Sequence, residues 1–437
     1  MPPIHPIPAV TYRQPQSSDL SALIAPPYDV LDEASKAALL RQSEHNIVVI
    51  DLPHLPPKTV GPDEAYQQAG QRYRQWLEAG VLERWQQPAV FVYQQTYTVG
   101  GQRYQRRGLI ANLPTQPFGR PGGIHPHEQT FASAKEDRLK LMRATRAQLS
   151  PIFGIYADPR QRTASLMQQV IQAGPPRFHA RTASDGVLHE VWAVQDPALI
   201  SAFSAELADK DVFIADGHHR YTTALNYLNE LTHQGRDPGG ASQCLFVLVS
   251  MHDPGMIVLP THRVLGRMPR FTMQRFIETA KGKLDIAPFP STNLAELEEA
   301  LRTHQGHHPI GLYDPTNPDE PLAIATTVSP DPLREKFPQQ SEAWRQLDVA
   351  IVQHLIVEEI CQPNFCEPSQ DVAWKFPHEL SRLEQETDGK DYQLGLILRP
   401  TPLEAVRQVS QAGELMPQKS TFFYPKLATG LVINPLD

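Results

Sequence analysis

The most telling segment of this chain reads Asp211-Val-Phe-Ile-Ala-Asp-Gly-His-His-Arg-Tyr-Thr-Thr-Ala-Leu225. Its apolar beginning, Val212 to Ile214, is typical of a buried strand, and the residues after the turn follow the pattern of an amphipathic helix. Gly217 stands between the two and accepts backbone angles that other residues resist. The segment therefore predicts a strand, a turn with one glycine, and a helix that begins near Arg220.

Five consecutive residues fill this turn: Asp216, Gly217, His218, His219 and Arg220. A glycine lets an anion approach the main chain, and a helix start presents unpaired N–H groups and the positive end of the helix dipole. An arginine adds a planar fork that matches phosphate geometry. The combination predicts a phosphate-binding site. The alternative is an ordinary strand-to-helix turn in which Asp216 only caps the helix.

Length and composition set the broad class of the protein. The chain has 437 residues, more than a typical single domain, so two or three domains are expected. Hydrophobic residues make up 41%, which is ample for a core, and the formal net charge is -8. This acidic balance argues against non-specific binding to nucleic acid as the main role. The three cysteines lack zinc-type spacing, and we expect them to be reduced.

Targeting and membrane signals are not evident in the sequence. The N-terminal residues lack a basic region followed by an apolar run, and no apolar stretch approaches the ~20 residues of a membrane span. The sequence therefore predicts a soluble, cytoplasmic protein with no membrane partner.

The hydrophobic pattern predicts an α+β fold, because strands, hairpins and helices are mixed rather than arranged as a doubly wound sheet. We expect a core domain over 1–268, a small α/β insertion over 269–340, and a C-terminal α/β segment over 341–437 that packs on the core. The predicted elements that matter below are a strand at 47–52, a helix at 63–79, a hairpin at 89–113, a glycine- and proline-rich loop at 118–126, a helix at 135–149 and an amphipathic helix at 344–360.

Two further polar clusters precede the central turn. Tyr28 and Asp29 follow a pair of prolines, which rigidify the approach and would aim the carboxylate, although an ordinary proline-rich turn has the same composition. His127 and Glu128 follow the glycine-rich loop, and a glutamate beside histidines suits a general base or a metal ligand. The charged residues at 135–138 equally suit the opening turn of a helix.

Two clusters follow the central turn. Thr261, His262 and Arg263 stand together, either as site residues or as a capped turn. Lys419 is followed by two hydroxyl residues, with Lys426 further along. That order resembles a phosphate clamp in composition only, because no glycine-rich Walker loop precedes it.

Taken together, the clusters favour phosphoryl transfer over acyl transfer. The chain has no Gly-x-Ser-x-Gly elbow, no suitable cysteine nucleophile, no dinucleotide fingerprint and no His-Glu-x-x-His helix. Phosphoryl transfer needs charge neutralisation and positioning, which Arg220, a helix N-terminus and Mg²⁺ would supply. No metal ligand is assigned within the chain.

Several motifs occur together along the chain. They are Ala25-Pro-Pro-Tyr-Asp-Val30, His127-Glu-Gln-Thr130, Asp137-Arg-Leu139, Ala215-Asp-Gly-His-His-Arg-Tyr-Thr-Thr-Ala224, Pro260-Thr-His-Arg263 and Pro417 to Pro425. This set resembles the domain-of-unknown-function family 1015 over nearly the whole chain. The biochemical role of that family is poorly defined, so the resemblance implies membership rather than an activity.

The turn from Gly217 to Arg220 also resembles the phosphate-contacting box of the ParB and sulfiredoxin superfamily. This resemblance implies a ParB/sulfiredoxin-like nucleotide-binding core, joined here to the smaller α/β part, in which the turn contacts nucleotide phosphates. One branch of the superfamily phosphorylates free serine with ADP or ATP. Sulfiredoxin has a reactive cysteine inside its turn where this chain has His218 and His219, so sulfinic-acid reduction is not expected.

From this resemblance we expect a phosphotransferase that moves a phosphoryl group from ATP or ADP, with Mg²⁺, to a small hydroxylated metabolite. Free L-serine is the first candidate for the acceptor. Glu128 or Asp29 would accept the hydroxyl proton. The residues expected to contact phosphate or to offset its charge are Asp216, Gly217, His218, His219, Arg220, Thr261, His262, Arg263 and Lys419, together with His127.

Two other classes of function stay open from the sequence. One is a metal-assisted phosphatase or hydrolase built from His127, Glu128, Asp216 and His218. The other is a non-catalytic nucleotide switch of the partition-protein type, although no basic helix-turn-helix supports binding to DNA. The oligomeric state is left open, and a homodimer is among the alternatives.

Overall fold

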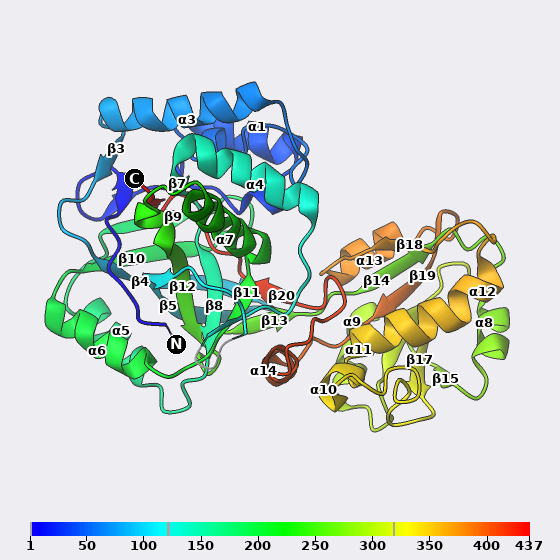
Figure 1. The fold of residues 1–437 in the computed structure, drawn as a ribbon. Coiled ribbons are helices and arrows are strands. Elements are labelled where there is room, and N and C mark those ends of the chain that lie inside the picture. The colour runs from blue at the N-terminus through cyan, green and yellow to red at the C-terminus, as the bar shows by residue number, and fades with distance from the viewer. Residues whose placement is uncertain (1, 120–122, 318–319) are drawn as a thin grey trace. The chain divides into compact units, whose positions relative to one another are not determined.

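The computed structural model describes residues 2–119, 123–317 and 320–437, so part of the predicted loop at 118–126 lies outside the described residues. The chain forms two compact units (Figure 1). Unit 1 comprises Met1–Ile257 and Pro425–Asp437, and unit 2 comprises Val258–Tyr424. This division differs from the three predicted segments, because residues 341–424 group with unit 2 and only the last residues return to unit 1. In the described part of the chain, no helix combines the length and apolarity of a membrane span.

A mixed sheet forms the centre of unit 1. Most of its neighbouring strands are antiparallel, and the predicted hairpin is confirmed as β4 and β5, with Gly100 and Gly101 at positive φ in its turn. Within the described residues the sheet contains, in spatial order, β2 (Ser18–Asp19), β9 (Phe178–Arg181), β10 (Leu188–Val194), β4 (Val90–Val99), β5 (Gln102–Pro114), β12 (Gln243–Ser250), β8 (Ile152–Tyr156), β11 (Val212–Asp216) and β6 (Ile124–His125).

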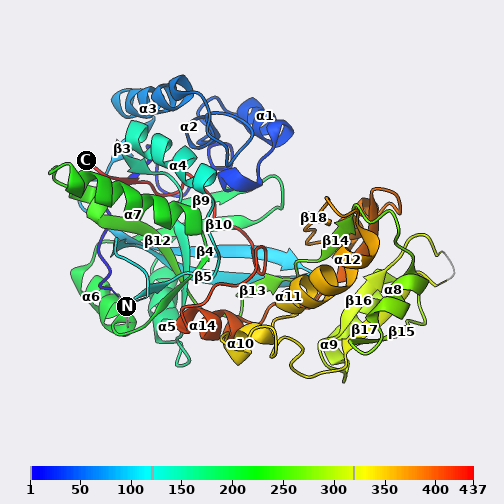
Figure 2. The same ribbon diagram turned by 45° about the vertical axis from the view of Figure 1, so that its right-hand side comes forward.

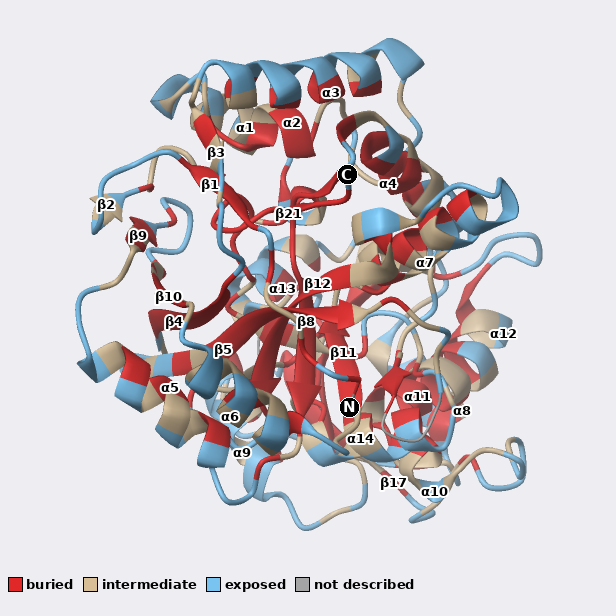
Figure 3. Cartoon of the chain, turned by 60° about the vertical axis from the view of Figure 1, so that its left-hand side comes forward, coloured by how far each residue is buried: buried red, intermediate tan, exposed pale blue. Residues whose placement is uncertain are grey.

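Helices cover this sheet in two groups, one with α4 and α7 and another with α5 and α6, and α3 packs on α4 as an outer layer (Figures 1 and 2). Alternate residues of β12 (Cys244, Phe246 and Leu248) pack with side chains from α4, α5, α6 and α7 in one apolar core. Figure 3 shows the central strands of this sheet as mostly buried and the outer surface of α3 as exposed. The helices are α1 (Glu33–Gln42), α2 (Val48–Asp51), α3 (Asp63–Glu78), α4 (Ala132–Thr145), α5 (Arg162–Gln172), α6 (Pro197–Leu207) and α7 (His218–His233).

Short elements complete unit 1. They are the 3-10 turns η1 (Tyr28–Val30) and η2 (Gly239–Ser242) and the strands β1 (Val10–Tyr12), β3 (Leu82–Arg84), β7 (Ala147–Gln148) and β21 (Asn434–Pro435). β21 pairs with β7, which ties the last residues of the chain to unit 1.

The strand predicted at 47–52 is wrong, because this segment forms the short helix α2. The Asn46 carboxamide oxygen accepts the Val48 N–H at 3.0 Å, and its amino group donates to the Ala22 and Ile24 carbonyls. An apolar run this short fits a buried helical turn as well as a strand. The side-chain bonds of Asn46 to the backbone favour the turn.

The pairing of β6 with β11 determines which loops meet. The two strands are parallel, with Val212 opposite Ile124 and Phe213 opposite His125. Because the carboxyl ends of parallel strands lie at the same edge of a sheet, the residues after β6 lie next to the turn after β11. This explains how the motif that begins at His127 reaches the central turn across about 90 residues of sequence.

Unit 2 is built around a second sheet and its own apolar core. Of the described residues, the sheet contains, in spatial order, β15 (Leu284–Pro288), β17 (Leu322–Thr327), β16 (Ile310–Tyr313), β19 (Tyr392–Ile397), β14 (Arg263–Gly266) and β18 (Ala373–Lys375), while β13 (Ile257–Leu259) pairs with β20 (Phe422–Tyr424). Its other helices are α8 (Met273–Ala280), α9 (Leu294–Thr303), α12 (Gln362–Phe365), α13 (Leu380–Glu386) and α14 (Leu403–Gln411).

The helix predicted at 344–360 is helical but not one uniform α-helix. The structure divides it into α10 (Glu342–Arg345), α11 (Asp348–Ile351) and a π-helical segment, Val352–Cys361. Its apolar residues belong to the core of unit 2, as the amphipathic pattern indicated.

Candidate functional site

The central segment folds as a strand, a glycine turn and a helix, as predicted. β11 ends at Asp216, Gly217 has φ +98°, and α7 begins at His218, two residues earlier than expected. A Cβ atom added to Gly217 would lie 3.1 Å from Cζ and Nε of Arg220. Glycine is therefore required here for two reasons, the backbone angle and the close approach of an arginine side chain.

Replacing Gly217 with alanine is expected to destabilise the protein by about 1–3 kcal/mol, because alanine is strained at this φ. Gly235 follows the other end of α7 at φ +65°, with nothing within 4 Å of an added Cβ, so Gly235→Ala is the matched control. We expect it to cost about 1 kcal/mol. Urea unfolding of both variants measures the difference, and equal losses would contradict the role given to the Arg220 contact.

Two cations meet the carboxylate of Asp216. Arg220 Nη2 donates to Oδ2 at 2.6 Å, and Lys426 Nζ donates to Oδ1 at 3.0 Å. Burial by itself would raise the pKa of Asp216, but Lys426 and Arg220 lower it further than burial raises it, so the net pKa lies below its ordinary range. One negative and two positive charges leave this group with one net positive charge at neutral pH.

Arg220 has a second bond, to the Pro151 carbonyl oxygen. Pro151 directly precedes β8, which lies beside β11 in the sheet. This contact fixes the guanidinium against the backbone, so Arg220 is held in place before any ligand arrives.

The start of α7 has the features of an anion site. Gly217 has no side chain with which to cap the helix, and the first intrahelical bond runs from the Tyr221 N–H to the Gly217 carbonyl at 2.9 Å. The amides of the three residues before Tyr221 therefore lie ahead of the hydrogen-bonded ladder of the helix. The positive end of the helix dipole adds to the charge of the two cations.

His218 and His219 attach the neighbouring loop to this helix start. His218 Nε2 accepts the His127 N–H at 3.2 Å, and His219 Nε2 accepts the Phe131 N–H at 2.9 Å. Their rings also contact the rings of the same two residues, His127 and Phe131. Since Nε2 accepts in both histidines, the proton of each neutral ring lies on Nδ1. The two histidines thus fix the loop that carries Glu128.

His127 and His218 are neutral in the folded protein. Burial lowers the pKa of His127, and burial followed by the proximity of His127 lowers the pKa of His218 well below its ordinary value. His127 Nδ1 faces the Ile214 carbonyl at 2.8 Å and must donate to it, so its Nε2 is the unprotonated nitrogen. Neither ring supplies positive charge at neutral pH.

The two carboxylates predicted as proton acceptors differ in their surroundings. Glu128 is partly buried and close enough to His127 to oppose the lowering of its pKa. Asp29 lies in η1, where its Oδ2 forms an ion pair with Lys58 at 3.3 Å. Glu128 is therefore on the loop bound to the helix start, and Asp29 pairs with Lys58 in η1.

The remaining predicted residues all lie in unit 2. Arg263 is buried and donates to the Thr261 carbonyl at 2.6 Å and to the Lys419 carbonyl at 3.0 Å. His262 is fully buried, accepts the Leu398 N–H at 3.2 Å, and has its pKa lowered to about 3 by burial. Within unit 2 these residues are joined by hydrogen bonds, in which Lys419 takes part through its backbone carbonyl.

Two features of unit 1 have little signal in the sequence. Lys426 contacts Asp216, whereas the sequence pattern favours Lys419 in that cluster. The pair Asp137 and Arg138, read as a helix opening, lies inside the fold: Arg138 Nε donates to Asp137 at 2.8 Å, and its Nη1 donates to the Asp51 carbonyl at 2.7 Å. One sequence signal indicates that Arg138 is buried. Asp137 and Arg138 are adjacent opposite charges on the helix face that also carries apolar residues.

The structure offers no ready metal cage in the residues it describes, because no three His, Cys, Asp or Glu side chains gather as metal ligands there. Asp216 is held by two cations and is a poor ligand on its own.

Residues 4–350 match a family described as "Protein of unknown function (DUF1015)". The chain belongs to the DUF1015 family. The matched residues include the central turn and the motifs at His127 and Arg263, whereas Lys426 lies beyond them. No curated protein matches the chain.

Solved structures give distant likenesses to this member of the DUF1015 family. A free serine kinase mutant in complex with AMP is 12% identical, with a TM-score of 0.34, over 70% of this chain and 88% of that one. SbnI from Staphylococcus aureus is 10% identical, with a TM-score of 0.35, over 75% and 87%. A conserved hypothetical protein from Pyrococcus furiosus is 14% identical, with a TM-score of 0.32, over 70% and 92%.

Proposed function

We propose that the turn between β11 and α7 binds the phosphates of ATP or ADP, and that the protein transfers a phosphoryl group to a small hydroxylated metabolite. Free L-serine is the first acceptor to test. The observation that carries the proposal is the pair of cations, Arg220 and Lys426, around Asp216 at the start of an α7 helix that Gly217 leaves uncapped. The same proposal assigns a ParB/sulfiredoxin-like core to unit 1.

Phosphate binding follows from the charge and the donors at this turn. A phosphate oxygen near the first amides of α7 would receive backbone donors and meet the positive end of the helix. Lys426 Nζ, which donates to Asp216 Oδ1, adds its positive charge next to the residue that directly precedes Gly217. Arg220, bound to Asp216 and Pro151, orients Asp216 and adds its charge.

Proton transfer is assigned to a carboxylate on the adjoining loop. Glu128 is the first candidate because His218 and His219 fix its loop on the helix start. Asp29 is the second, and its Oδ2 pairs with Lys58. The hydroxyl of the acceptor would lose its proton to this group as the phosphoryl bond forms, as in other positioned general-base reactions.

The structure changes the role that we give to the histidines. Because His127 is neutral and its Nε2 is an acceptor, it is unsuited to offset charge on a transferring phosphoryl group. Lys426 takes that role in the proposal, with Mg²⁺ on the nucleotide supplying the rest of the neutralisation. His127 and His218 act as positioning residues for the loop.

Replacing Lys426 with methionine is expected to weaken nucleotide binding at least tenfold, because the turn loses its net positive charge. Lys426→Arg should keep most of the affinity, and Lys336→Met, at a partly exposed position paired with Glu358, is the control. Calorimetric titration with Mg–ADP and Mg–ATP measures these affinities. Equal affinity of wild type and Lys426→Met would contradict the phosphate assignment.

The reaction is tested by mass spectrometry after incubation with Mg²⁺, ATP or ADP, and L-serine. We expect phosphoserine from wild type and a loss of at least a hundredfold in Glu128→Gln, with Asp29→Asn as the parallel variant. If only Asp29→Asn loses phosphoserine formation, the role of general base belongs to Asp29 and not to Glu128. Nucleotide hydrolysis without phosphoserine would favour a hydrolase, and binding without any turnover would favour a nucleotide switch.

A further inference from the structure

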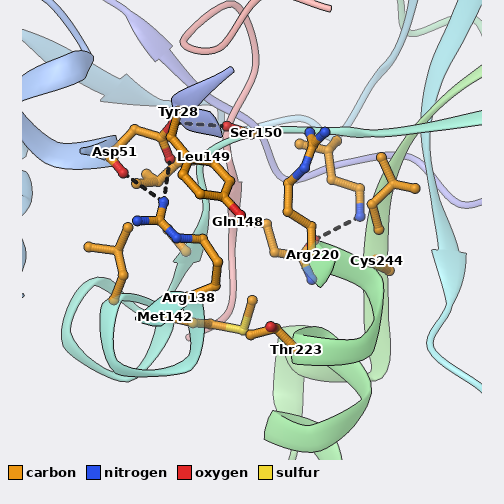
Figure 4. A pocket seen from close by; sticks show the side chains of 14 residues that line it. Tyr28, Asp51, Arg138, Met142, Gln148, Leu149, Ser150, Arg220, Thr223 and Cys244 are labelled. Carbon is orange, nitrogen blue, oxygen red and sulfur yellow. Dashed lines mark hydrogen bonds and ion pairs between the residues drawn. The ribbon is translucent and has the colours of Figure 1, made fainter. Parts of the chain in front are cut away.

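A small cavity lies inside unit 1 beside the central turn. It has a volume of about 40 Å³, and Arg220 and Thr223 of α7 contribute to its lining together with Arg138 of α4. In the view of Figure 4, Arg138, Asp51 and Tyr28 lie on one side, and Arg220 and Cys244 lie on the other. Because a buried water needs roughly 10–15 Å³ of such space, the cavity has room for about three heavy atoms.

Arg138 brings an unsatisfied charged donor to this cavity. Its Nε and Nη1 are taken up by Asp137 and the Asp51 carbonyl, but the buried Nη2 has no hydrogen-bond partner among the described residues. The Tyr28 ring covers the guanidinium at 3.8 Å, so bulk water does not reach it from that side. A buried guanidinium nitrogen without an acceptor is unfavourable, and a ligand that accepts its hydrogens would remove the cost.

The rest of the lining favours an acidic group as that ligand. Two guanidinium groups, those of Arg138 and Arg220, border the cavity, and Asp51 is the carboxylate that borders it. The Ser150 hydroxyl donates to Asp51 at 3.2 Å, which occupies part of that carboxylate. Charged donors form their strongest hydrogen bonds with anionic oxygens.

We infer that this cavity is a binding subsite for the oxyanion group of a small acid, held by Arg138 Nη2 with Arg220 across from it. A carboxylate has three heavy atoms and matches the space. A phosphoryl group has the same acceptor chemistry and is the other source, and with four or more heavy atoms it would enter this space only in part. Because Arg220 belongs both to the cavity and to the turn, an acid bound here lies next to the phosphate site. The assignment of this cavity to the phosphoryl acceptor rests on the proposed function. The binding of an oxyanion in the cavity does not depend on that function.

The test measures binding of single probes by calorimetry on the full chain carrying Lys426→Met, which weakens the phosphate site at the turn. Inorganic phosphate and L-serine are the probes, and ethanolamine, which lacks the carboxylate, is the negative control. We expect at least one of the two acids to bind and ethanolamine not to bind. Binding of phosphate alone would identify the source as a phosphoryl group, and binding of L-serine would identify it as a carboxylate.

Two further substitutions locate the binding. Arg138→Met removes the donor, and Thr223→Ile fills the cavity without touching Arg138. Each is expected to weaken oxyanion binding at least tenfold, while Arg143→Met on the exposed side of α4 should leave it within twofold. If Arg138→Met does not fold, the affinity of Thr223→Ile for the acid probes still tests the subsite. Unchanged affinity in Thr223→Ile, or no binding of either acid, would overturn the subsite.

The same experiment separates this inference from the proposed function. If wild type binds no nucleotide but an acid binds in a manner sensitive to Thr223→Ile, the proposed function fails and the subsite stands. If nucleotides bind at the turn and neither acid binds, the subsite fails and the phosphate site stands.

Discussion

Replacing Arg138 with methionine is expected to lower the free energy of unfolding by about 3–5 kcal/mol, the usual cost of removing one partner from a buried ion pair. Arg138 lies between two aspartates inside unit 1, with its Nε 2.8 Å from Asp137 and its Nη1 3.5 Å from the Asp51 carboxylate. Asp137 also accepts hydrogen bonds from the Tyr66 hydroxyl and from His54, both at 2.8 Å. Methionine fills the space but leaves these carboxylates without their cation.

The effect of Arg138→Met should depend on pH with a definite sign. Burial raises the pKa of Asp51, and Arg138 partly opposes that rise, so the variant raises it further. When the pKa of a carboxyl group is raised in the folded state, the free energy of unfolding falls as the pH rises towards that pKa, because the unfolded chain loses this proton first. The penalty for removing Arg138 should therefore be larger at pH 7.5 than at pH 5.

The matched control for this prediction is Arg143→Met on the same helix. Arg143 is 42% exposed and pairs with Glu230 at 2.6 Å, so its loss should cost at most about 1 kcal/mol. Urea unfolding of both variants at the two pH values gives the comparison. Similar losses for the two arginines would contradict the view that burial makes Arg138 important.

Local patterns in the sequence predicted the elements whose signals are local. The central strand, the turn at Gly217 and the helix after it depend on an apolar run, a glycine and a helical period within fifteen residues. The hairpin of β4 and β5 likewise carries its signal in Gly100 and Gly101. In both cases the residues that determine the shape are neighbours in the chain.

The site as a whole could not be predicted, because its members are joined by pairing that the local pattern does not encode. Lys426 meets Asp216 across 210 positions, and it lies in unit 1 because β21 returns the chain to β7. His127 reaches the turn because β6 is parallel to β11. The segment at 47–52 failed for a related reason, since the partners of Asn46 that favour a helical turn include carbonyls more than twenty residues away.

The early start of α7 changed the meaning of the histidines. The sequence placed His218 and His219 in a loop, where both could face a ligand. In the structure they belong to the first turn of the helix and accept backbone N–H groups from the neighbouring loop. Their part in the site is to hold that loop, and it requires them to be unprotonated at Nε2.

This requirement leads to the second large effect, a loss of stability in mild acid. Burial lowers the pKa of His127 and His218, and burial followed by Arg106 lowers that of His189, on β10, to about 3. The unfolded chain binds these protons near pH 6.5 and the folded chain does not, so stability falls as the pH drops below 6.5. His189 alone should cost up to about 1.36 kcal/mol per pH unit between pH 6.5 and its folded pKa of about 3.

The measurement is the free energy of unfolding by urea at pH 7.5, 6.0 and 5.0 for wild type and His189→Gln, with His233→Gln as a control at an exposed position of α7. Glutamine cannot take up a proton, so the slope of stability against pH should fall by about 1.36 kcal/mol per pH unit in His189→Gln. An unchanged slope would mean that His189 titrates equally in both states. Because the pKa of His218 is lowered well below its ordinary value, His218 should keep its bond to the His127 N–H over this pH range. The affinity for nucleotide should therefore change little while the free energy of unfolding already falls, which separates the loop of the site from the stability of the sheet.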